Sequence, residues 1–555
     1  MASIKVNDKP LNVKDGLPLG VSLYEAGIYS YEGSFKLGRP RGPMSFEWWS
    51  PERVYVEGYG PVSHSLMKCS DGLKIRVGSG GIKRPFIEAV SPFLKAGFQH
   101  GYFFRSKIGW KITWSFMKRT LSHPEIPDKV ERKDLPNPME VETDVLVVGG
   151  GISGLSAAIS AGKTGAKVVL LDGNEEIGGH LFYDERLRNL EKEAEKFGVK
   201  IMRGTALAAV FEDAFFATQF REPDATPILI RAKSIVIATG AREVLSVFGN
   251  NDLPGVMLGT SALKLVKLYG VKPGRRGIVM GSNKWAVEIA RLLSSSGIDI
   301  TLVHDKEVNA EGIKTVKARV LEALGREKVR GVKLDDGSTL EADFIALANV
   351  RAPSIEIAAQ LGVKIGFHMK LGGFVPLHGW AGETSVNGVF IAGEAGGVDE
   401  EEALIHFSRA AGISAAKHAG FSAPDAEEEI AEGRRVSKNM EDVVEGYKKG
   451  ELCVFDDDLG LLQNPDHNRS FLCPCLDVTT SDVKRIVKEL GWTKMEKIKR
   501  YSGLGTGRCQ GKYCLLSSVI YVSKIGKVRP VDVGTFRIRP PSVPIQLGVL
   551  GGMDR

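Results

Sequence analysis

Apolar residues occur along this chain in short blocks, separated by turn residues, that predict the strands and helices of an α/β protein. In the clearest block, the apolar run Val145–Val148 leads into a glycine-rich turn. A helical pattern over Leu155–Gly162 and a second apolar run over Lys167–Leu171 follow. A strand, a tight turn, a helix and a second strand in this order predict a β-α-β unit with parallel strands.

The glycines of this turn have the spacing G-x-G-x-x-G, with Gly149, Gly151 and Gly154 in the three places and Asp172 after the second strand. The first glycine allows the tight turn, the second lets a pyrophosphate approach the backbone, and the third allows close packing of helix on strand. The carboxylate of Asp172 then suits ribose hydroxyls. The alternative is a glycine-rich turn that arose by chance. Because the strand, the helix, the second strand and the acid all occur at the positions that the motif requires, we predict a bound adenine dinucleotide.

Two later apolar strands extend this unit. Ser234–Gly240 ends in Ala-Thr-Gly, and the stretch after Gly388 ends in Ala-Gly-Glu, with a helical pattern from Glu401 to Gly412. Both endings resemble those of two-dinucleotide-binding flavoproteins, which implies FAD, with an acid at position 394 near the ribityl–phosphate end. That family usually has Asp there, and Glu394 is one methylene longer. The cofactor-binding residues that we predict are Gly149, Gly151, Ile152, Ser153, Gly154, Asp172, Gly173, Gly179, His180, Ala238, Thr239, Gly240, Gly393 and Glu394.

The β-α-β pattern recurs in residues 277–305, which predicts a second dinucleotide-type fold. Gly281 begins the turn, but Asn283 replaces the second glycine, and the place matching Asp172 holds His304 with Asp305 beside it. Successive strand residues face opposite sides, so the acid is displaced from the ribose position. We include Gly281 and Asn283 among the candidate cofactor residues. Nicotinamide binding and a retained scaffold both remain open.

Four of the six cysteines lie near the C-terminus in the order C-x-C, 33 residues, C-x4-C: Cys473, Cys475, Cys509 and Cys514. Two paired thiolate sites suit the two irons of a [2Fe–2S] cluster, whereas structural zinc prefers wider knuckles. Thr479–Asp482 has helix-cap chemistry, and Gly503, Gly505 and Gly507 form a loop whose N–H groups can face cluster sulfur. We predict a [2Fe–2S] cluster on these four cysteines, with zinc or an empty site as alternatives. The segment closely resembles bacterioferritin-associated-ferredoxin-like [2Fe–2S] domains.

The first hundred residues predict a small β-rich domain. Ile4–Val6 and Leu11–Val13 alternate around an Asn-Asp turn, which indicates a hairpin, and Leu19–Ala26 has helical spacing. The order resembles a β-grasp ferredoxin-like domain, without that fold's cluster cysteines. Arg39 and Arg41 stand in a basic loop that either contacts a phosphate or partner or is simply solvated.

Composition adds limits. The chain has 555 residues, 43% of them hydrophobic, and a net charge of only +7 without a continuous basic stripe, so nucleic-acid binding is not expected. The N-terminus lacks an apolar signal core and we find no apolar run long enough to span a bilayer. Clustered cysteines in such a chain favour a reduced, cytoplasmic protein, peripheral to a membrane only through a partner.

The order of these segments, with ATGARE, NDLPGVML and the tail FRIRPP, resembles the alpha subunits of heterotetrameric sarcosine oxidase, dye-linked L-proline dehydrogenase and hydrogen cyanide synthase. The resemblance implies that the first site holds FAD, NAD or ATP, that an FMN lies between subunits, and that a flavoprotein beta subunit carries the substrate site. Small ferredoxin-like subunits and an acceptor protein, dye or quinone complete the implied partners. The folate-binding domain of the sarcosine oxidase subunit is missing.

The fold class that we predict is α/β, a Rossmann-like two-dinucleotide-binding flavoprotein with an N-terminal β-grasp-like domain and a small helical C-terminal [2Fe–2S] domain. Its expected parts are a β-grasp-like domain (1–105), an aromatic arm and linker (106–140), a dinucleotide domain (141–262 and 376–425) with an inserted NAD-like domain (263–375), a connector (426–465), the cluster domain (466–525) and a tail (526–555). We interpret the chain as the electron-transfer subunit of a flavin-dependent amine or amino-acid dehydrogenase. A stand-alone NAD(P)H-dependent reductase and a nucleotide-binding scaffold are the alternatives. No catalytic residue is assigned.

Overall fold

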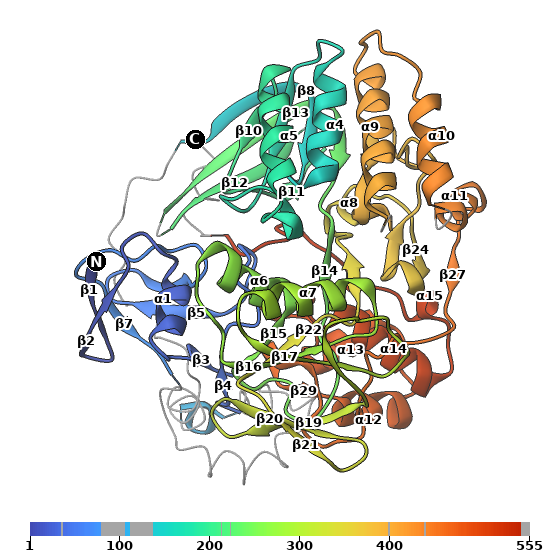
Figure 1. The fold of residues 1–555 in the computed structure, drawn as a ribbon. Coiled ribbons are helices and arrows are strands. Elements are labelled where there is room, and N and C mark those ends of the chain that lie inside the picture. The colour runs from blue at the N-terminus through green and yellow to red at the C-terminus, as the bar shows by residue number, and fades with distance from the viewer. Residues whose placement is uncertain are drawn as a thin grey trace. The chain divides into compact units, whose positions relative to one another are not determined.

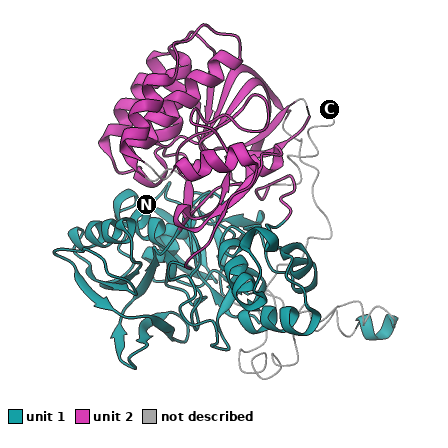
Figure 2. Cartoon of the chain, turned by 90° about the vertical axis from the view of Figure 1, so that its right-hand side faces the viewer, with its two compact units in different colours: residues 1–132, 243–350, 458–536 teal, residues 133–242, 351–457, 537–555 magenta. Residues whose placement is uncertain are grey.

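The computed structural model describes residues 1–34, 37–78, 106–111, 137–212, 214–222, 224–397, 400–437 and 440–545. The chain forms two compact units, each assembled from three separate stretches (Figure 2). Unit 1 holds residues 1–132, 243–350 and 458–536, and unit 2 holds residues 133–242, 351–457 and 537–555. None of the described helices is both long and apolar enough to cross a membrane.

Unit 1 begins with a five-stranded sheet in the order β2-β1-β7-β5-β6. Its elements are β1 (Ala2–Val6), β2 (Lys9–Val13), α1 (Leu19–Glu25), β5 (Arg53–Val56), β6 (Gly60–Ser63) and β7 (Lys74–Arg76). The hairpin prediction is confirmed: β1 pairs antiparallel with β2, and Asn7 and Asp8 have the positive φ angles that a tight hairpin turn requires. Helix α1 buries Leu19 and Leu23 against Ile4 and Val54 of the sheet.

Unit 2 is organised by a seven-stranded sheet, in which β10-β9-β8-β13-β12-β11 follow one another and β26 pairs with β13 (Figure 1). Its elements are β8 (Met139–Val148), α4 (Ile152–Gly162), β9 (Val168–Leu171), α5 (Glu185–Lys196), β10 (Lys200–Met202), β11 (Thr205–Val210), β12 (Phe215–Arg221), β13 (Asp224–Ile237), β26 (Val389–Ile391) and α9 (Glu401–His418). Strands β8, β9, β10, β13 and β26 are joined by parallel pairings, as the apolar runs predict. Helices α4 and α9 pack closely at Gly412 because glycine has no side chain. A Cβ there would lie 2.1 Å from the carbonyl oxygen of Ala157.

A second parallel sheet, in the order β15-β22-β16-β17-β18, lies in unit 1. Its elements are β15 (Val256–Leu258), α6 (Gly259–Leu263), β16 (Arg276–Met280), α7 (Lys284–Ser295), β17 (Asp299–His304), β18 (Lys314–Lys317) and β22 (Phe344–Leu347). The antiparallel strands β19 (Val320–Gly325), β20 (Val329–Leu334) and β21 (Thr339–Glu341) follow β18. The internal repeat predicted from the sequence is therefore a second dinucleotide-type fold.

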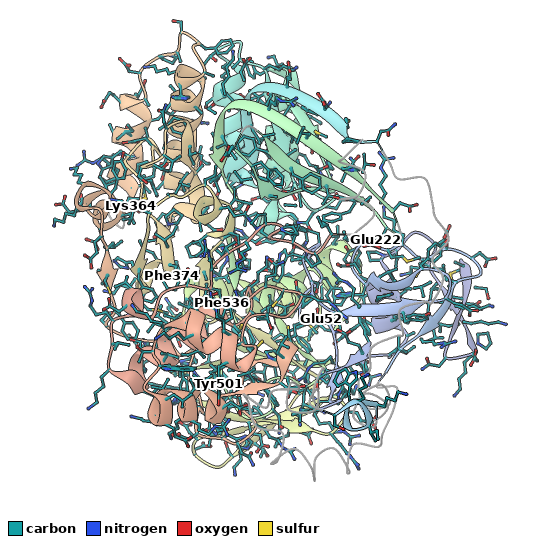
Figure 3. The ribbon with its side chains drawn as sticks, turned by 180° about the vertical axis from the view of Figure 1, so that it is seen from behind. Glu52, Glu222, Lys364, Phe374, Tyr501 and Phe536 are labelled. Carbon is teal, nitrogen blue, oxygen red and sulfur yellow. The ribbon has the colours of Figure 1, made fainter. Side chains whose placement is uncertain are left out.

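The cysteine-rich end of unit 1 is small and mostly helical. Its elements are β28 (Phe471–Cys473), β29 (Val478–Thr479), α12 (Thr480–Leu490), α13 (Met495–Ser502), α14 (Leu515–Gly526) and α15 (Pro530–Val533). The predicted helix start is confirmed: Thr479 caps α12, and Asp482 returns the bond in a capping box. The ring of Phe536, which Figure 3 labels, packs against Gly505 of the glycine loop, where a Cβ would lie 2.4 Å from the ring.

The rest of unit 2 consists of β23 (Arg351–Pro353), α8 (Glu356–Gln360), β24 (Ile365–His368), β25 (Gly373–Pro376), α10 (Glu427–Val436), α11 (Met440–Lys449) and β27 (Cys453–Val454). The units change over at 242/243 and 350/351. Strand β24 pairs with β25 and β27, and all three belong to unit 2. The domain borders predicted at 262/263 and 375/376 stay predictions. Cys453 lies in β27, away from the other cysteines in sequence.

The aromatic-rich stretch and the C-terminal tail are described to different extents. Of the aromatic arm, Trp110 lies in the described segment 106–111, while Tyr102, Phe103, Phe104, Trp114 and Phe116 lie outside the described residues. The tail packs within unit 2: the Ser542 amide donates to the carbonyl of Ala208 at 2.7 Å, and Val543 is buried. For this part of the tail, intramolecular packing is the observed role.

Candidate functional site

The glycine turn between β8 and α4 combines two closed positions with one open position. A Cβ at Gly149 would lie 2.1 Å from the carbonyl oxygen of Ala238, and one at Gly154 would lie 1.8 Å from that of Gly149. These two glycines are therefore required by packing. A Cβ at Gly151 would meet nothing nearer than the oxygen of Gly178 at 3.9 Å. The second glycine thus opens a cradle along the backbone, which is the shape that a pyrophosphate needs.

The N-terminus of α4 faces this cradle without a side-chain cap. Gly151 is the N-cap residue, and no side chain accepts a hydrogen bond at this helix start. The first N–H groups, on Ile152 and Ser153, thus receive no side-chain cap, which is the arrangement that anion-binding helix ends have. Gly393, with φ +70°, closes on the same helix end, since a side chain there would lie 2.1 Å from Ser153 Oγ.

Asp172 stands directly after β9 and is held by backbone amides. Its Oδ2 accepts the Gly150 N–H at 2.7 Å and its Oδ1 accepts the Asn174 N–H at 2.8 Å. A carboxylate is an acceptor with about four lone-pair positions, which is the chemistry that ribose hydroxyls need. Gly173 and Gly179 lie in the adjoining turns, and Gly179 has φ +61°. The ribose contact stays a prediction.

The last predicted acid, Glu394, is engaged by an arginine that sequence reasoning missed. Arg351 donates to both carboxylate oxygens of Glu394, with Nη2 2.7 Å from Oε2. Its Nη2 also lies 2.9 Å from His180 Nδ1, and Arg351 donates to the carbonyl of Ala241. Burial raises the pKa of Glu394, opposed by Arg351. Burial, and then the charge of Arg351, hold the pKa of His180 well below its usual range. No local motif marks Arg351; the fold places it there by way of β23.

The Ala-Thr-Gly ending of β13 is anchored to the same stretch of unit 2. Thr239 Oγ1 donates to the Ser354 carbonyl at 3.1 Å, and the Ser354 amide donates to the Gly240 carbonyl at 2.9 Å. Gly240 has φ +64° and lies near Glu394. The structure thus brings the ends of β8, β9, β13 and β26 to one edge of the sheet, where doubly wound folds bind nucleotides.

The second dinucleotide-type turn, in unit 1, differs in the position where Asn283 replaces glycine. The Asn283 side chain accepts the Ala286 N–H at 2.8 Å, capping α7. Its amide also donates to the carbonyls of Ala348 and Asn349, at 2.8 and 2.6 Å. The helix end that would face a phosphate is therefore satisfied by the protein itself. Gly281 keeps its tight-turn role, because a Cβ there would lie 2.7 Å from the Ala348 oxygen.

The far side of this second turn is also occupied by the chain. Asp305 accepts a hydrogen bond from Ser282 Oγ at 2.8 Å, and His304 Nδ1 lies 2.8 Å from the Lys306 carbonyl. Asn349 donates to the Gly460 carbonyl at 2.6 Å, and a Cβ at Gly460 would lie 2.8 Å from Asp305. The connector segment around Gly460 thus lies against the carboxyl end of β17, where a ribose would sit in this fold.

The two cysteine pairs, 33 residues apart in sequence, meet in the C-terminal part of unit 1. Cys473, Cys509 and Cys514 are buried and Cys475 is half-buried. The sulfurs of Cys475 and Cys509 are 3.7 Å apart. Hydrogen bonds from Cys475 and Cys514 hold the pKa of Cys473 well below its usual value, and the pKa of Cys509 is lowered chiefly by Cys475. Each sulfur therefore has at least one cysteine neighbour.

The glycine loop also contacts the sulfurs. The backbone N–H of Gly505 donates to Cys473, as does that of Leu476. A Cβ at Gly507 would lie 2.6 Å from Cys475 Cβ, so glycine allows the loop to approach. Within the described residues, no group of three or more His, Cys, Asp or Glu side chains meets the geometry of a site for one metal ion. A [2Fe–2S] cluster spreads four thiolates over two irons, and it remains a prediction for these residues.

Of the two alternatives left open for the basic loop, solvation is wrong for Arg39 and Arg41. Arg39 and Arg41 are 3% and 7% exposed. Both donate to the carboxylate of Asp252, and Arg41 also donates to Asp477. These ion pairs satisfy the guanidinium groups inside unit 1, because buried charges require partners.

Comparison with known families matches residues 120–221 and 143–419 to the pyridine nucleotide-disulphide oxidoreductases, and residues 467–553 to the sarcosine oxidase A3 domain. The sarcosine oxidase alpha subunit of Rhizobium meliloti (strain 1021) is 26% identical over 600 residues, covering 99% of this chain and 57% of the relative. The alpha subunit of Corynebacterium sp. (strain P-1) is 27% identical, covering 75% of this chain and 46% of the relative. The chain thus spans about half the length of these relatives.

An opine oxidase subunit of Agrobacterium tumefaciens (strain Ach5) is 22% identical, covering 73% of this chain and 91% of the relative. Among solved structures, L-proline dehydrogenase from P. horikoshii is similar with a TM-score of 0.74 and 23% identity, over 99% of this chain and 97% of that one. The likeness shows the fold along the chain. It agrees with the predicted Rossmann-like α/β class.

Proposed function

We propose, from the premise that this chain belongs to the pyridine nucleotide-disulphide oxidoreductase family, that it is the electron-transfer subunit of a flavin-dependent amine or amino-acid dehydrogenase or oxidase. The donor class is suggested by its relatives, which are subunits of sarcosine oxidases and opine oxidases. Proline- and sarcosine-type substrates are the first candidates. The substrate-oxidising flavin belongs, in this proposal, to a partner beta subunit.

One observation carries the proposal: two cysteine pairs from separate segments meet, buried, in a chain that also has an open dinucleotide cradle. A flavin takes up two electrons as a hydride, whereas a [2Fe–2S] cluster passes them on singly. A chain that holds both kinds of group is suited to convert one form of electron transfer into the other.

The residues of the first site have separate roles in this proposal. The cradle at Gly151 admits the pyrophosphate of FAD, and the free N–H groups at the start of α4 bind its charge. Asp172 orients the ribose. The Glu394 carboxylate is already paired with Arg351, so it contributes a fixed dipole here rather than a free acceptor. NAD or ATP would use the same cradle, and an FMN between subunits is a further cofactor that the proposal allows.

The four cysteines hold the [2Fe–2S] cluster in this proposal. Cys473 and Cys475 would bind one iron and Cys509 and Cys514 the other, each pair on its own short segment. The N–H groups of Gly505 and Leu476, which donate to Cys473, would stabilise the negative charge on the Cys473 thiolate.

The stand-alone NAD(P)H reductase is the weaker alternative. Its nicotinamide nucleotide would bind the second dinucleotide-type turn, where Asn283 caps α7 and Gly460 lies beside Asp305. A ligand would have to displace both. The scaffold alternative differs in predicting no redox turnover in any complex.

The proposal is tested by copurification from the native source, followed by dye-reduction assays with proline, sarcosine and glycine. We expect the isolated chain to be inactive with these amines and a copurifying flavoprotein beta subunit to restore dye reduction. Small ferredoxin-like subunits and an acceptor protein or quinone would be identified in the same preparation. Robust amine oxidation by the pure chain would overturn the proposal, and rapid NADH-to-dye turnover would favour the reductase.

A further inference from the structure

The N-terminal sheet of unit 1 lacks the cysteines to hold a cluster, yet residues from its surroundings contact the C-terminal cysteine segments. The Leu37 amide donates to Asp477 Oδ2 at 3.0 Å, two residues after Cys475. Glu32 accepts from Arg508, beside Cys509, with Nη1 2.9 Å from Oε2. The ring of Trp49 packs edge-on against Tyr513, beside Cys514, at 5.5 Å between centroids. Both cysteine segments are thus held by the N-terminal part of the chain.

Arg41 makes the most direct of these contacts. It lies on β4 (Pro40–Arg41), which pairs with β3 (Glu32–Gly33). Its Nη2 lies 3.0 Å and its Nε 3.2 Å from the carbonyl oxygen of Pro474, the residue between Cys473 and Cys475. A forked guanidinium that donates twice to one carbonyl fixes the orientation of that peptide. The peptide that Arg41 holds is the one that joins two predicted ligands.

The charges around Arg41 explain why it stays buried. Asp252 accepts from both Arg39 and Arg41, and Asp477 Oδ1 accepts from Arg41 at 2.5 Å. The group contains two cations and two anions, all almost fully buried. Arg39 shares Asp252 and donates to Asn250, and both guanidinium groups lie over the ring of Phe471. Of the two, Arg41 is the one that donates to the Pro474 carbonyl, which makes Arg39 a matched control for that contact.

We propose that Arg41 is a positioning residue of the cysteine centre (Cys473, Cys475, Cys509 and Cys514): it holds the Pro474–Cys475 peptide between two predicted ligands and places a buried positive charge against that peptide. The inference rests on the proposed [2Fe–2S] site for its electronic part. Reduction adds one negative charge to such a centre, and a nearby cation stabilises the reduced form, so Arg41 raises the reduction potential. The N-terminal domain thus tunes a centre that it cannot itself bind.

The test uses the full chain, purified anaerobically as wild type, Arg41→Gln, Arg41→Lys and Arg39→Gln. Iron and sulfide are counted, and the midpoint potential is measured by redox titration with EPR. We expect Arg41→Gln to lower the equilibrium constant for reduction about tenfold, which is about 59 mV for one electron. Arg41→Lys should recover most of this shift because it keeps the charge, and Arg39→Gln should shift the potential less. An unchanged potential in Arg41→Gln with a full cluster, or an equal shift in Arg39→Gln, would overturn the proposal.

A second readout separates this inference from the cluster assignment. If the wild-type chain holds no iron, the [2Fe–2S] proposal fails, and positioning is judged on the thiols. Native-state labelling with a thiol reagent should then be faster at Cys475 in Arg41→Gln than in Arg39→Gln. Equal labelling rates in the two variants would overturn the positioning role. Thermal unfolding of every variant identifies any that fails to fold. If Arg41→Gln does not fold, the labelling rate at Cys475 in the milder variant Arg41→Lys is compared with that in Arg39→Gln instead.

Discussion

Arg351 forms a two-point ion pair with Glu394, with Nη2 2.7 Å from Oε2, although 43 residues separate them in the chain. Both side chains are 14% exposed. The pair stands where the parallel strands β13 and β26 of unit 2 end, beside Gly240 and His180. Its place means that the acid predicted to meet the cofactor is oriented by the protein before any cofactor binds.

From the Arg351–Glu394 ion pair we predict that substitutions of the two residues have strongly non-additive effects on the free energy of unfolding. Replacing Arg351 by Met should destabilise the chain by up to about 3 kcal/mol, because a mostly buried carboxylate loses its partner. Adding Glu394→Gln should return part of that loss, since the remaining side chain is neutral. Denaturant unfolding of both single variants and the double variant measures the coupling. Additive effects would show that the pair does not act as a unit.

The glycine turn predicts a separation between binding and folding. Gly151→Val should remove the bound adenine nucleotide while the chain stays folded, because a side chain there enters only the open cradle. Gly154→Val should instead prevent folding of unit 2, since its Cβ would lie 1.8 Å from the Gly149 oxygen. Chromatography of the compound released on denaturation, together with thermal unfolding, checks both. We expect FAD from the wild type; release of ATP or NAD would keep the site and defeat the flavin assignment.

His180 predicts a pH dependence of stability. Burial and Arg351 hold its pKa below the usual value, so between the two pKa values only the unfolded chain binds this proton. The contribution of neutral His180 to the free energy of unfolding is therefore fully present above about pH 6.5. It falls as the pH drops below that value, by at most about 1.4 kcal/mol per pH unit. His180→Gln should flatten the profile between about pH 5.5 and 7. The raised pKa of Glu394 acts with the opposite sign, so the comparison is repeated in Glu394→Gln. An identical slope with and without His180 would contradict the prediction.

The cysteine centre predicts one [2Fe–2S] cluster per chain. Cys475→Ser should lose most of the iron and sulfide, because one of four ligands is removed from the less buried edge of the centre. Cys453→Ser is the matched control and should keep both, since Cys453 lies in β27 of unit 2. Iron and sulfide counts with EPR of the reduced protein measure this. Stoichiometric zinc without iron in the wild type would rule the assignment out.

Local chemistry was sufficient to predict a large part of this protein. The Gly149–Gly154 turn, the hairpin at Asn7 and Asp8, and the Thr479 cap follow from residues a few positions apart. Apolar periodicity also predicted parallel strands in a sheet of each unit, because strands and helices bury whole faces and so leave a pattern in the sequence. The spacing of the four cysteines by itself likewise indicates a shared centre.

Tertiary structure alone decided the fate of the charged and polar residues. Arg39 and Arg41 would also suit an exposed loop. They form a buried ion-pair network because the fold brings Asp252 and Asp477 next to them. Asn283 closes the second turn because the carbonyls of Ala348 and Asn349 end beside it. The charge of a side chain determines which kind of partner it needs when it is buried. The long-range packing of strands determines which residue becomes that partner, and this cannot be predicted from a local sequence pattern.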